Sequence, residues 1–484
     1  MKMYQKGLIL GIMALLVVGC KEDDAPVEAK AKADVKKYVS IGNSLTAGYQ
    51  SGGLYRSAQV NGYPNLIAKQ LVAASATIGT FEIPYWEDPG SYGADGKSSR
   101  LVLKSLTGPV IVTEGLAPGT ASNLNLARPY DNLGIPGSIV YDFLDTTNFI
   151  SKSTARANPF FGHVLRSSSF GASILKQAKA LNPDLVSFWL GNNDVLGYAT
   201  SGGTAKSAFT GTAVPTPAAM FTSFYNAALD SLRANLPNAK LVVGNIPDVK
   251  AVPYFTTIGP KVAAALPTGV YARYQKGGNT GVAMDSSRFT EANAPFLTLT
   301  ASTYAPYIGV ASGKWYKDNK YPALPTGIDT TKQFGVHPQN PLPDALVLDA
   351  AEQVVAANAI ASFNSTIAAA ATKNNAALVD VNTIFNNIKA NGITVGGVKY
   401  TTDFITGQLF SLDGVHPSSK GQGIVANEYI KALNKKFGFS ISEVDVAALP
   451  GISVTPLAKY VPNSKMIIGD SYQSWKPFLS LWLN

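Results

Sequence analysis

The chain has 484 residues, of which 46% are hydrophobic and 15% are charged, so it can bury one large core or two modest ones. Its formal net charge is +9, but the Lys and Arg residues are spread thinly, without a dense basic block interleaved with aromatic residues, and nucleic acid is therefore not an expected partner. Cys20 is the only cysteine, which excludes disulfides within the chain and sites built from several thiolates.

The N-terminus carries the pattern of a secretory signal. Two lysines precede an uncharged apolar run at residues 7–19, which is too short to span a bilayer and stops at Cys20. The junction Leu16-Val17-Val18-Gly19-Cys20 resembles the bacterial lipobox, whose cysteine becomes the lipidated first residue of the mature chain. We therefore predict a lipoprotein signal peptide over residues 1–19 and a lipid anchor on Cys20 that binds the membrane. The alternative is an ordinary signal peptide with an incidental cysteine.

The residues after Cys20 predict where the protein is anchored. The run Lys21-Glu22-Asp23-Asp24 resembles the acidic export signal that sends some Bacteroidetes lipoproteins to the cell surface, although short acidic runs are usually solvated tether. Residues 25–37 are rich in Ala and Lys. We expect residues 20–36 to be a tether and the protein to be an outer-membrane lipoprotein, with the acidic run indicating exposure at the cell surface.

Beyond the tether, short apolar runs alternate with helical patterns. The apolar runs predict buried strands at residues 37–41, 185–190, 241–244 and 377–381. Helical patterns lie between them at residues 171–181, 217–236 and 348–373. This alternation predicts βαβ units and a doubly wound parallel sheet, which is an α/β fold.

Three long stretches do not fit this alternation, namely about 73–128, 249–346 and the residues after 437. They are rich in Gly, Pro, Thr and aromatic residues, so we expect insertions that fold over one face of the core. Loops of this length are usually lids or binding elements. The expected organisation is one domain over residues 37–438 that contains the first two insertions, followed by a C-terminal extension, 439–484, packed on the core.

The first predicted strand ends in Gly42-Asn43-Ser44-Leu45, which places Ser44 where a parallel sheet carries its chemistry. A serine hydroxyl is a poor nucleophile unless a base takes its proton, and the base works best when a third group fixes its tautomer. Ser44 is therefore a candidate nucleophile that needs a histidine and a carboxylate from elsewhere in the chain.

The chain has three histidines, His163, His337 and His416. Only His416 has a carboxylate placed to orient it locally, because Asp413 precedes it by three residues in Asp413-Gly414-Val415-His416-Pro417. His337 lies in the similar string Phe334-Gly335-Val336-His337-Pro338, where Phe334 takes the place of Asp413. An isolated histidine is more often a packed or surface residue, so His416 is the preferred base.

Two further segments could stabilise the oxyanion of acyl transfer, which needs preorganised donors. Gly137, at the end of the run at residues 132–137, could offer a backbone N–H on a loop that only glycine lets approach closely. Asn193, in Gly191-Asn192-Asn193-Asp194, could offer its side-chain amide. The alternatives are that Gly137 is a turn glycine and that Asn193 caps the following helix.

These four segments, in this order along the chain, resemble the four blocks of the SGNH, or GDSL, hydrolase family. The first block usually reads Gly-Asp-Ser-Leu, and here Asn43 stands in place of the Asp. Asn245-Ile246-Pro247, followed by Val252-Pro253, also looks like a segment of longer family members. The resemblance covers about residues 36–438 and says nothing about the insertions.

The resemblance implies a three-layer α/β/α sandwich with a five-stranded parallel sheet, of which the apolar runs give four strands. It implies an acyl-enzyme on Ser44, with His416 as general base and then acid, Asp413 orienting it, and an oxyanion hole from Ser44, Gly137 and Asn193. The implied enzyme is a carboxylic ester hydrolase that needs no metal and no organic cofactor, and its substrate is a lipid, a small acyl ester or an acetylated glycan.

Several alternatives remain open. Gly469-Asp470-Ser471 spells the first block literally, but it follows the His416 block and lies too near the C-terminus for a helix and strand after it. A polysaccharide O-acetyl esterase would use the same machinery. A non-catalytic glycan-binding surface lipoprotein would not need it, and a metal-dependent hydrolase would use His416 and Asp413 as ligands without the usual histidine spacing.

Overall fold

The computed structural model describes residues 33–93, 96–106, 109–147, 158–276 and 284–454. The predicted signal peptide, Cys20, most of the tether and Ser471 lie outside these residues. Packing begins earlier than the predicted boundary at residue 37. Ala33 and Val35 are buried in the main core, and the Val35 carbonyl accepts a hydrogen bond from the Thr77 N–H at 3.0 Å.

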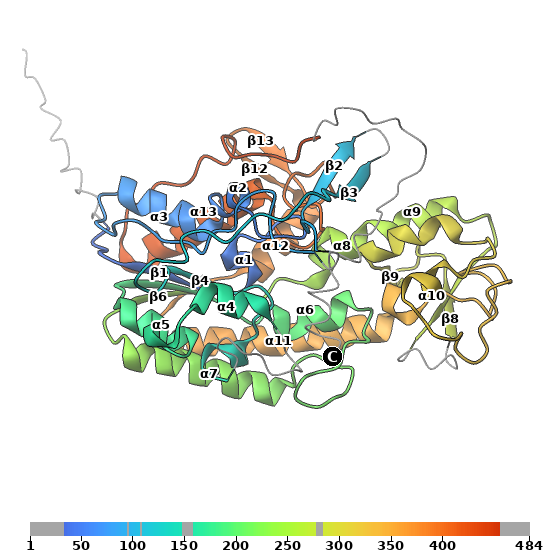
Figure 1. Ribbon diagram of the computed structural model, residues 1–484, viewed down its shortest axis with the longest axis horizontal. Helices are drawn as coiled ribbons and strands as arrows, with labels where there is room; N and C mark the ends of the chain where they lie inside the picture. The colour runs from blue at the N-terminus through green and yellow to red at the C-terminus, as the bar shows by residue number, and fades with distance from the viewer. Residues whose placement is uncertain (1–32, 94–95, 107–108, 148–157, 277–283, 455–484) are drawn as a thin grey trace, which may run out of the picture.

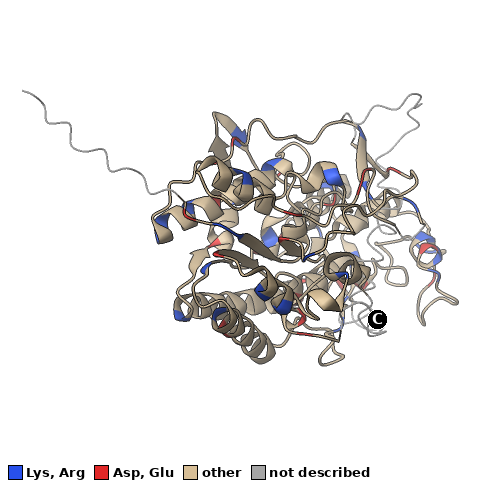
Figure 2. Ribbon diagram, turned by 60° about the vertical axis from the view of Figure 1, so that its left-hand side comes forward, with Lys and Arg blue, Asp and Glu red and all other residues tan. Residues whose placement is uncertain are grey.

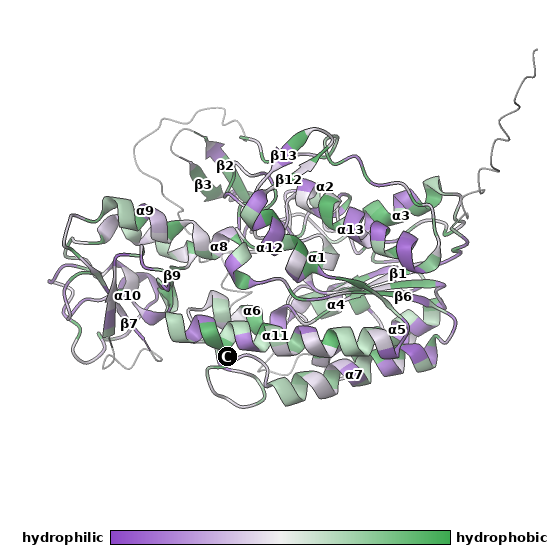
Figure 3. Cartoon of the chain, turned by 180° about the vertical axis from the view of Figure 1, so that it is seen from behind, coloured by the Kyte–Doolittle hydropathy of each residue, from purple (hydrophilic) through white to green (hydrophobic). Residues whose placement is uncertain are grey.

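A five-stranded parallel sheet forms the centre of the molecule (Figure 1). Its order is β11 (Ala377–Val379), β6 (Lys240–Gly244), β5 (Leu185–Trp189), β1 (Tyr38–Gly42) and β4 (Asn132–Gly134). Neighbouring strands all pair in parallel. The four predicted strands are confirmed with ends that differ by at most two residues. Most of their residues are apolar and buried, and β1 and β6 are largely green in Figure 3, as expected for strands covered on both faces.

The fifth strand is β4, which the sequence pattern does not show. It has three residues, Asn132-Leu133-Gly134, too few and too polar to form an apolar run. It is a strand because it pairs with β1, with Ser40 opposite Asn132 and Gly42 opposite Gly134. Because β4 and β1 pair in parallel, the loops that follow them start at the same edge of the sheet. These loops contain Gly137 and Ser44.

Helices cover both faces of the sheet and make the predicted three layers (Figure 1). One face carries α3 (Tyr63–Ala73) and α13 (Ser419–Phe437), which pack on each other, and α13 contacts β6 and β11. The other face carries α5 (Ile174–Leu181), α7 (Ala218–Asn235) and α11 (Ala350–Lys373). The last three confirm the helices predicted from the sequence. The short helices α1 (Ser44–Ala47), α6 (Asn193–Thr200) and α12 (Val381–Asn391) follow strands β1, β5 and β11.

Helix α11 is long and apolar enough to cross a membrane by length and composition alone, and it is the one such helix among the described residues. It nevertheless packs in the core. Ala356, Ile360 and Phe363 are buried on one side of it, and the Phe363 ring stacks on Phe221 of α7 with centroids 3.8 Å apart. A capping box between Asp349 and Glu352 starts the helix. These contacts bury one side of α11 against α7 and the main core.

Of the two long insertions, the second and the hairpin of the first lie beyond the carboxyl ends of the strands, at the right of Figure 1, whereas Thr77 of the first bonds to Val35 just before β1. The first contains the hairpin of β2 (Leu101–Ser105) and β3 (Val110–Thr113). The second contains α8 (Pro253–Thr256), α9 (Ile258–Ala265), β7 (Ala272–Gln275), β8 (Met284–Ser287), β9 (Phe296–Leu297) and α10 (Lys314–Asp318), before β10 (Val347–Leu348). Its apolar residues join the main core, as Leu299, Trp315 and Phe334 do.

The remaining elements connect these layers. They are α2 (Arg56–Gln59), α4 (Pro159–Leu165), and the hairpin of β12 (Ile393–Val395) and β13 (Val398–Tyr400). After α13, residues 439–454 run back along that helix, and Phe439, Ile441 and Val446 are buried in the main core. Figure 2 shows Lys and Arg scattered over many helices and loops, in keeping with the thin spread of charge in the sequence.

Candidate active site

Ser44 is the first residue of α1, immediately after β1 and the cap residue Asn43. The Asn43 Oδ1 accepts a hydrogen bond from the Leu45 N–H at 3.0 Å, which is the usual role of an N-cap side chain. Its Nδ2 donates to Asn192 Oδ1 at 3.3 Å. Asparagine in place of the family's Asp therefore keeps the acceptor that caps the helix and adds a donor that a carboxylate lacks.

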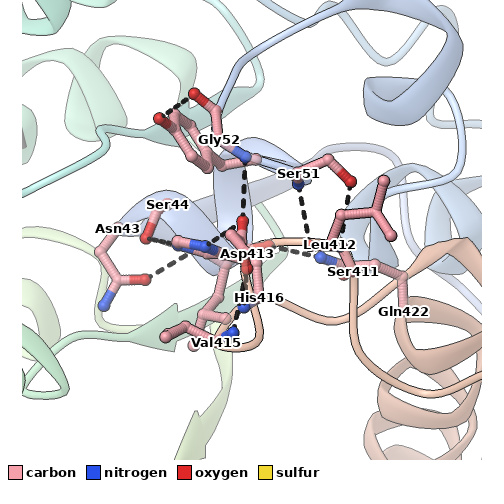
Figure 4. A network of polar contacts seen from close by, with 12 residues as sticks. Asn43, Ser44, Ser51, Gly52, Ser411, Leu412, Asp413, Val415, His416 and Gln422 are labelled. Atoms are coloured by element: carbon pink, nitrogen blue, oxygen red, sulfur yellow. Dashed lines mark hydrogen bonds and ion pairs between the residues drawn. The ribbon is translucent and has the colours of Figure 1, made fainter. Parts of the chain in front are cut away.

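His416 joins Ser44 to Asp413 (Figure 4). Its Nε2 lies 2.9 Å from Ser44 Oγ, and its Nδ1 lies 3.0 Å from Asp413 Oδ2. All three side chains are buried, with 2% or less of Ser44, Asp413 and His416 exposed. An ionised carboxylate can only accept, so Nδ1 carries the ring proton and Nε2 is free to accept from the serine hydroxyl. Residues 372 positions apart in the chain thus form one line of hydrogen bonds.

The Asp413 carboxylate is held in its ionised form. Burial works to raise its pKa, but the His416 imidazole and the hydrogen bonds that the carboxylate accepts outweigh burial, and the pKa lies below the ordinary value of 3.8. Oδ1 accepts from the N–H groups of Val415 and His416 at 3.0 and 2.9 Å. Oδ2 accepts from Gly52 N–H at 3.0 Å in addition to the imidazole. Four hydrogen bonds therefore fix this one side chain.

Gly414 makes the turn between Asp413 and His416 possible. Its φ is +72°, a conformation that favours glycine, and a Cβ there would lie 2.9 Å from the Leu299 side chain. Its carbonyl accepts a hydrogen bond from the Tyr254 N–H at 2.9 Å. Tyr254 and Leu299 belong to the second insertion, so this insertion packs directly on the loop that carries the histidine.

The turn at residues 49–52, just after α1, supports the loop that carries Asp413 and His416, and sequence reasoning missed it. The Tyr49 hydroxyl donates to the Gly52 carbonyl at 2.5 Å, and the Tyr49 ring lies 4.8 Å from the His416 ring. The Ser51 N–H donates to Ser411 Oγ at 2.8 Å. The sequence signal is weak, because Ser-Gly pairs mark any turn.

The two predicted oxyanion donors lie close to each other. Asn193 is the first residue of α6, and its Nδ2 donates to the Ser138 carbonyl at 2.9 Å. Gly137 precedes Ser138 and has a φ of +79°. Asn193 and Ser44 line the same cavity. Gly137 is thus a turn glycine, and Asn193 does not cap α6, because Asn192 occupies the cap position.

The other two histidines lie elsewhere. His337 is in the second insertion, where its Nδ1 accepts from the Gln339 N–H at 3.1 Å and the neighbouring Phe334 is buried in the core. His163 is on α4, with its Nε2 2.9 Å from the Pro84 carbonyl oxygen. Burial disfavours its charged form and lowers its pKa to about 4, so His163 is neutral at pH 7.

A cavity opens beside Ser44 and His416. It holds about 650 Å³ of space that atoms do not fill, part of which is open to solvent. Most side chains that line it are apolar, among them Trp189, Leu196, Ile246, Val252, Phe385 and Phe410. Both ring nitrogens of His416 engage protein atoms, and the described residues contain no group of three His, Cys, Asp or Glu side chains that could hold a metal ion.

Comparison with solved structures returns weak likenesses that cover most of both chains. A protein from Parabacteroides merdae described as a GDSL-like lipase is 15% identical, covers 83% of this chain and 98% of its own, and has a TM-score of 0.32. An acetyl xylan esterase is 16% identical, with coverages of 82% and 99% and a TM-score of 0.31. An extracellular lipase from Streptomyces rimosus is 15% identical, with coverages of 83% and 99% and a TM-score of 0.33.

Comparison with protein families is more informative. No curated protein sequence matches the chain significantly. The family model described as GDSL-like lipase/acylhydrolase matches residues 38–429, which run from β1 to α13 and include Ser44, Gly137, Asn193, Asp413 and His416. Since this match spans most of the chain, the protein belongs to the GDSL-like lipase/acylhydrolase family and is a carboxylic ester hydrolase.

Proposed function

We propose that the protein cleaves carboxylic esters through an acyl-enzyme on Ser44, with His416 as the base and Asp413 as the group that orients it. The observation that carries this proposal is the buried line of hydrogen bonds from Ser44 Oγ through the His416 ring to Asp413. As Oγ attacks the ester carbonyl, Nε2 takes the hydroxyl proton and the ring becomes positively charged. The Asp413 carboxylate stabilises this charge and keeps Nε2 directed at the serine.

The oxyanion of the tetrahedral intermediate forms beside the ends of β4 and β5. We assign it three donors, the backbone N–H groups of Ser44 and Gly137 and the Nδ2 of Asn193. The Asn193 amide has two protons, and the bond to the Ser138 carbonyl uses one and fixes the orientation of the other. His416 then gives its proton to the leaving alcohol. Water attacks the acyl-Ser44 ester with His416 again acting as base, which releases the acid and restores the serine.

Covalent labelling tests the nucleophile without requiring the natural substrate. A fluorophosphonate reacts with an activated serine, whose oxygen displaces fluoride from phosphorus, and we expect one label per chain, on Ser44. Peptide mass spectrometry locates the label. The Ser44→Ala protein should remain unlabelled, whereas Ser471→Ala and His337→Ala should be labelled like the wild type. A label on Ser471, or a folded protein that takes no label, would favour the alternative nucleophile or the non-catalytic lipoprotein.

We also propose that the mature chain is an outer-membrane lipoprotein that begins at a lipidated Cys20. The support is the junction at residues 16–20 and the start of packing at Ala33, which leaves a short tether between anchor and core. The acidic residues 22–24 support exposure at the cell surface.

Metabolic labelling checks the anchor. Cells given an alkyne-bearing fatty acid should label the wild type, and Cys20→Ser should abolish the label and move the protein out of the membrane fraction. Lys21→Ala is the matched control, and this variant should keep both the fatty-acid label and its place in the membrane fraction. Replacing Glu22, Asp23 and Asp24 with alanine should keep the label but reduce cleavage by external protease. A labelled, membrane-bound Cys20→Ser protein would contradict the lipid anchor.

A further inference from the structure

The cavity beside Ser44 has a wall that the proposed mechanism does not use. It is formed by Ile246, Pro247, Val249 and Val252, which we call the Ile246 wall. They follow β6, and all but Val249 belong to the segment Asn245-Ile246-Pro247 and the pair Val252-Pro253, which the sequence singles out without a role. The Ile246 wall is also where the second insertion begins, so the insertion contributes directly to the cavity next to the nucleophile.

The polar backbone groups at the start of this wall are occupied by other parts of the fold. The Ile246 N–H donates to Asn364 Oδ1 of α11 at 2.8 Å. The Ile246 carbonyl accepts from Asn364 Nδ2 and from Asn382 Nδ2 of α12, both at 2.9 Å. Pro247 has no N–H to offer. Asn364 and Asn382 therefore occupy the polar backbone groups of Ile246. At Ile246 and Pro247 the wall presents only hydrocarbon to the cavity.

The other sides of the cavity are similar. Val195 and Leu196 come from α6, Phe385 comes from α12, and Phe410 and Val415 come from the loop before His416. Apart from Asp248, the polar residues of the lining belong to the segments that carry Ser44, Asn193 and His416. Asp248 Oδ1 already accepts a hydrogen bond from the Lys250 N–H at 2.9 Å. Beyond the reacting groups, the cavity therefore offers few partners for hydroxyl groups.

We propose that this cavity binds the hydrocarbon chain of the acyl group, so that the enzyme prefers medium-chain acyl esters to acetyl esters. The proposal rests on the proposed function, because the chain enters the cavity from the carbonyl carbon attached to Ser44. Each methylene that leaves water should raise kcat/KM about fourfold, which corresponds to the free energy of burying one CH₂ group. A sugar hydroxyl in the same place would lose its hydrogen bonds to water and bind about tenfold or more weakly.

Leu196 offers a matched pair of variants. It is partly buried and lines the cavity from α6, so Leu196→Trp should shorten the space for the chain. Leu175 of α5 is also partly buried against the core but does not line the cavity. In purified protein, the wild-type kcat/KM should be at least tenfold higher for p-nitrophenyl octanoate than for the acetate. Leu196→Trp should lower this ratio at least tenfold, and Leu175→Trp should leave it within twofold.

A second series separates the two sides of the ester. Ethyl octanoate should be cleaved faster than octyl acetate, because the proposal assigns the cavity to the acyl side. A flat or falling acyl series, an unchanged ratio in Leu196→Trp, or a preference for octyl acetate would each overturn the assignment. Activity in Ser44→Ala would instead refute the proposed function, so the two failures are distinguishable.

Binding provides a readout that needs no turnover. Calorimetry of the Ser44→Ala protein should show octanoate binding at least tenfold more tightly than butanoate, with a negative heat-capacity change that marks burial of apolar surface. Leu196→Trp in the Ser44→Ala protein should weaken the binding of octanoate, and Leu175→Trp should leave this binding unchanged. Equal affinity for the two acids, or no binding of octanoate, would overturn the proposal even if no ester is hydrolysed.

Discussion

Replacing Ser44 with alanine should lower kcat for p-nitrophenyl butanoate by about 10⁴- to 10⁶-fold. The change removes the oxygen that forms the acyl-enzyme, and the oxyanion donors and binding groups that remain supply only a small residual rate. Little else should change. The Ser44 carbonyl, which accepts from Gly48 and Tyr49, is the same in alanine, and alanine favours the helix that begins there.

Two controls make this result specific. Ser471→Ala removes the serine of the second Gly-Asp-Ser string, and His337→Ala removes the histidine of the second Gly-Val-His-Pro string. Both should keep wild-type kcat within about twofold, because the proposed mechanism uses neither side chain. Melting curves should show that Ser44→Ala is folded. Turnover within about 100-fold of the wild type in folded Ser44→Ala protein would mean that another group carries the reaction.

Replacing Asp413 with asparagine should lower kcat by about 10³- to 10⁴-fold. The amide can keep its oxygen at the Oδ1 position, where Val415 and His416 donate. Its NH₂ group then faces two donors, the Gly52 N–H and the His416 Nδ1–H, where Oδ2 accepted both. The ring can restore a hydrogen bond only by moving its proton to Nε2, and this tautomer cannot take the Ser44 proton.

The same substitution should change how stability depends on pH. The folded-state pKa of Asp413 is depressed, so its ionisation stabilises the protein above the ordinary value of 3.8 and this contribution is lost as the pH falls through the lower folded pKa. The difference in Tm between wild type and Asp413→Asn should therefore shrink as the pH is lowered from about 5 towards 2.

Asp403→Asn is the matched control, because Asp403 is exposed on the loop before the same segment and accepts from Thr401. It should leave both kcat and the pH profile of Tm unchanged. If Asp413→Asn kept full activity, or if its difference in Tm from the wild type did not vary with pH, Asp413 would not be the orienting carboxylate.

The sequence by itself determined the features that depend on short stretches of chain. The four predicted strands lie in apolar runs, and Asp413 lies three residues before His416, so a single turn through Gly414 joins the two side chains. The same reasoning separated His416 from His337, because Phe334 cannot hydrogen-bond an imidazole and instead packs in the core. The order of four short blocks then indicated the family that the match over residues 38–429 shows.

Only the tertiary structure decided the features that depend on contacts between distant segments. Strand β4 is defined by its pairing with β1, since its three residues, Asn132-Leu133-Gly134, do not lie in an apolar run. The Gly52 N–H reaches Asp413 across 361 positions, and the two asparagines that fix the Ile246 wall come from α11 and α12. Hydrogen bonds of this kind are set by how layers pack, and a local pattern of residues cannot encode which distant backbone group will be the partner. The sequence therefore named the candidate reacting groups, and the packing decided which residues hold them and which cavity lies beside them.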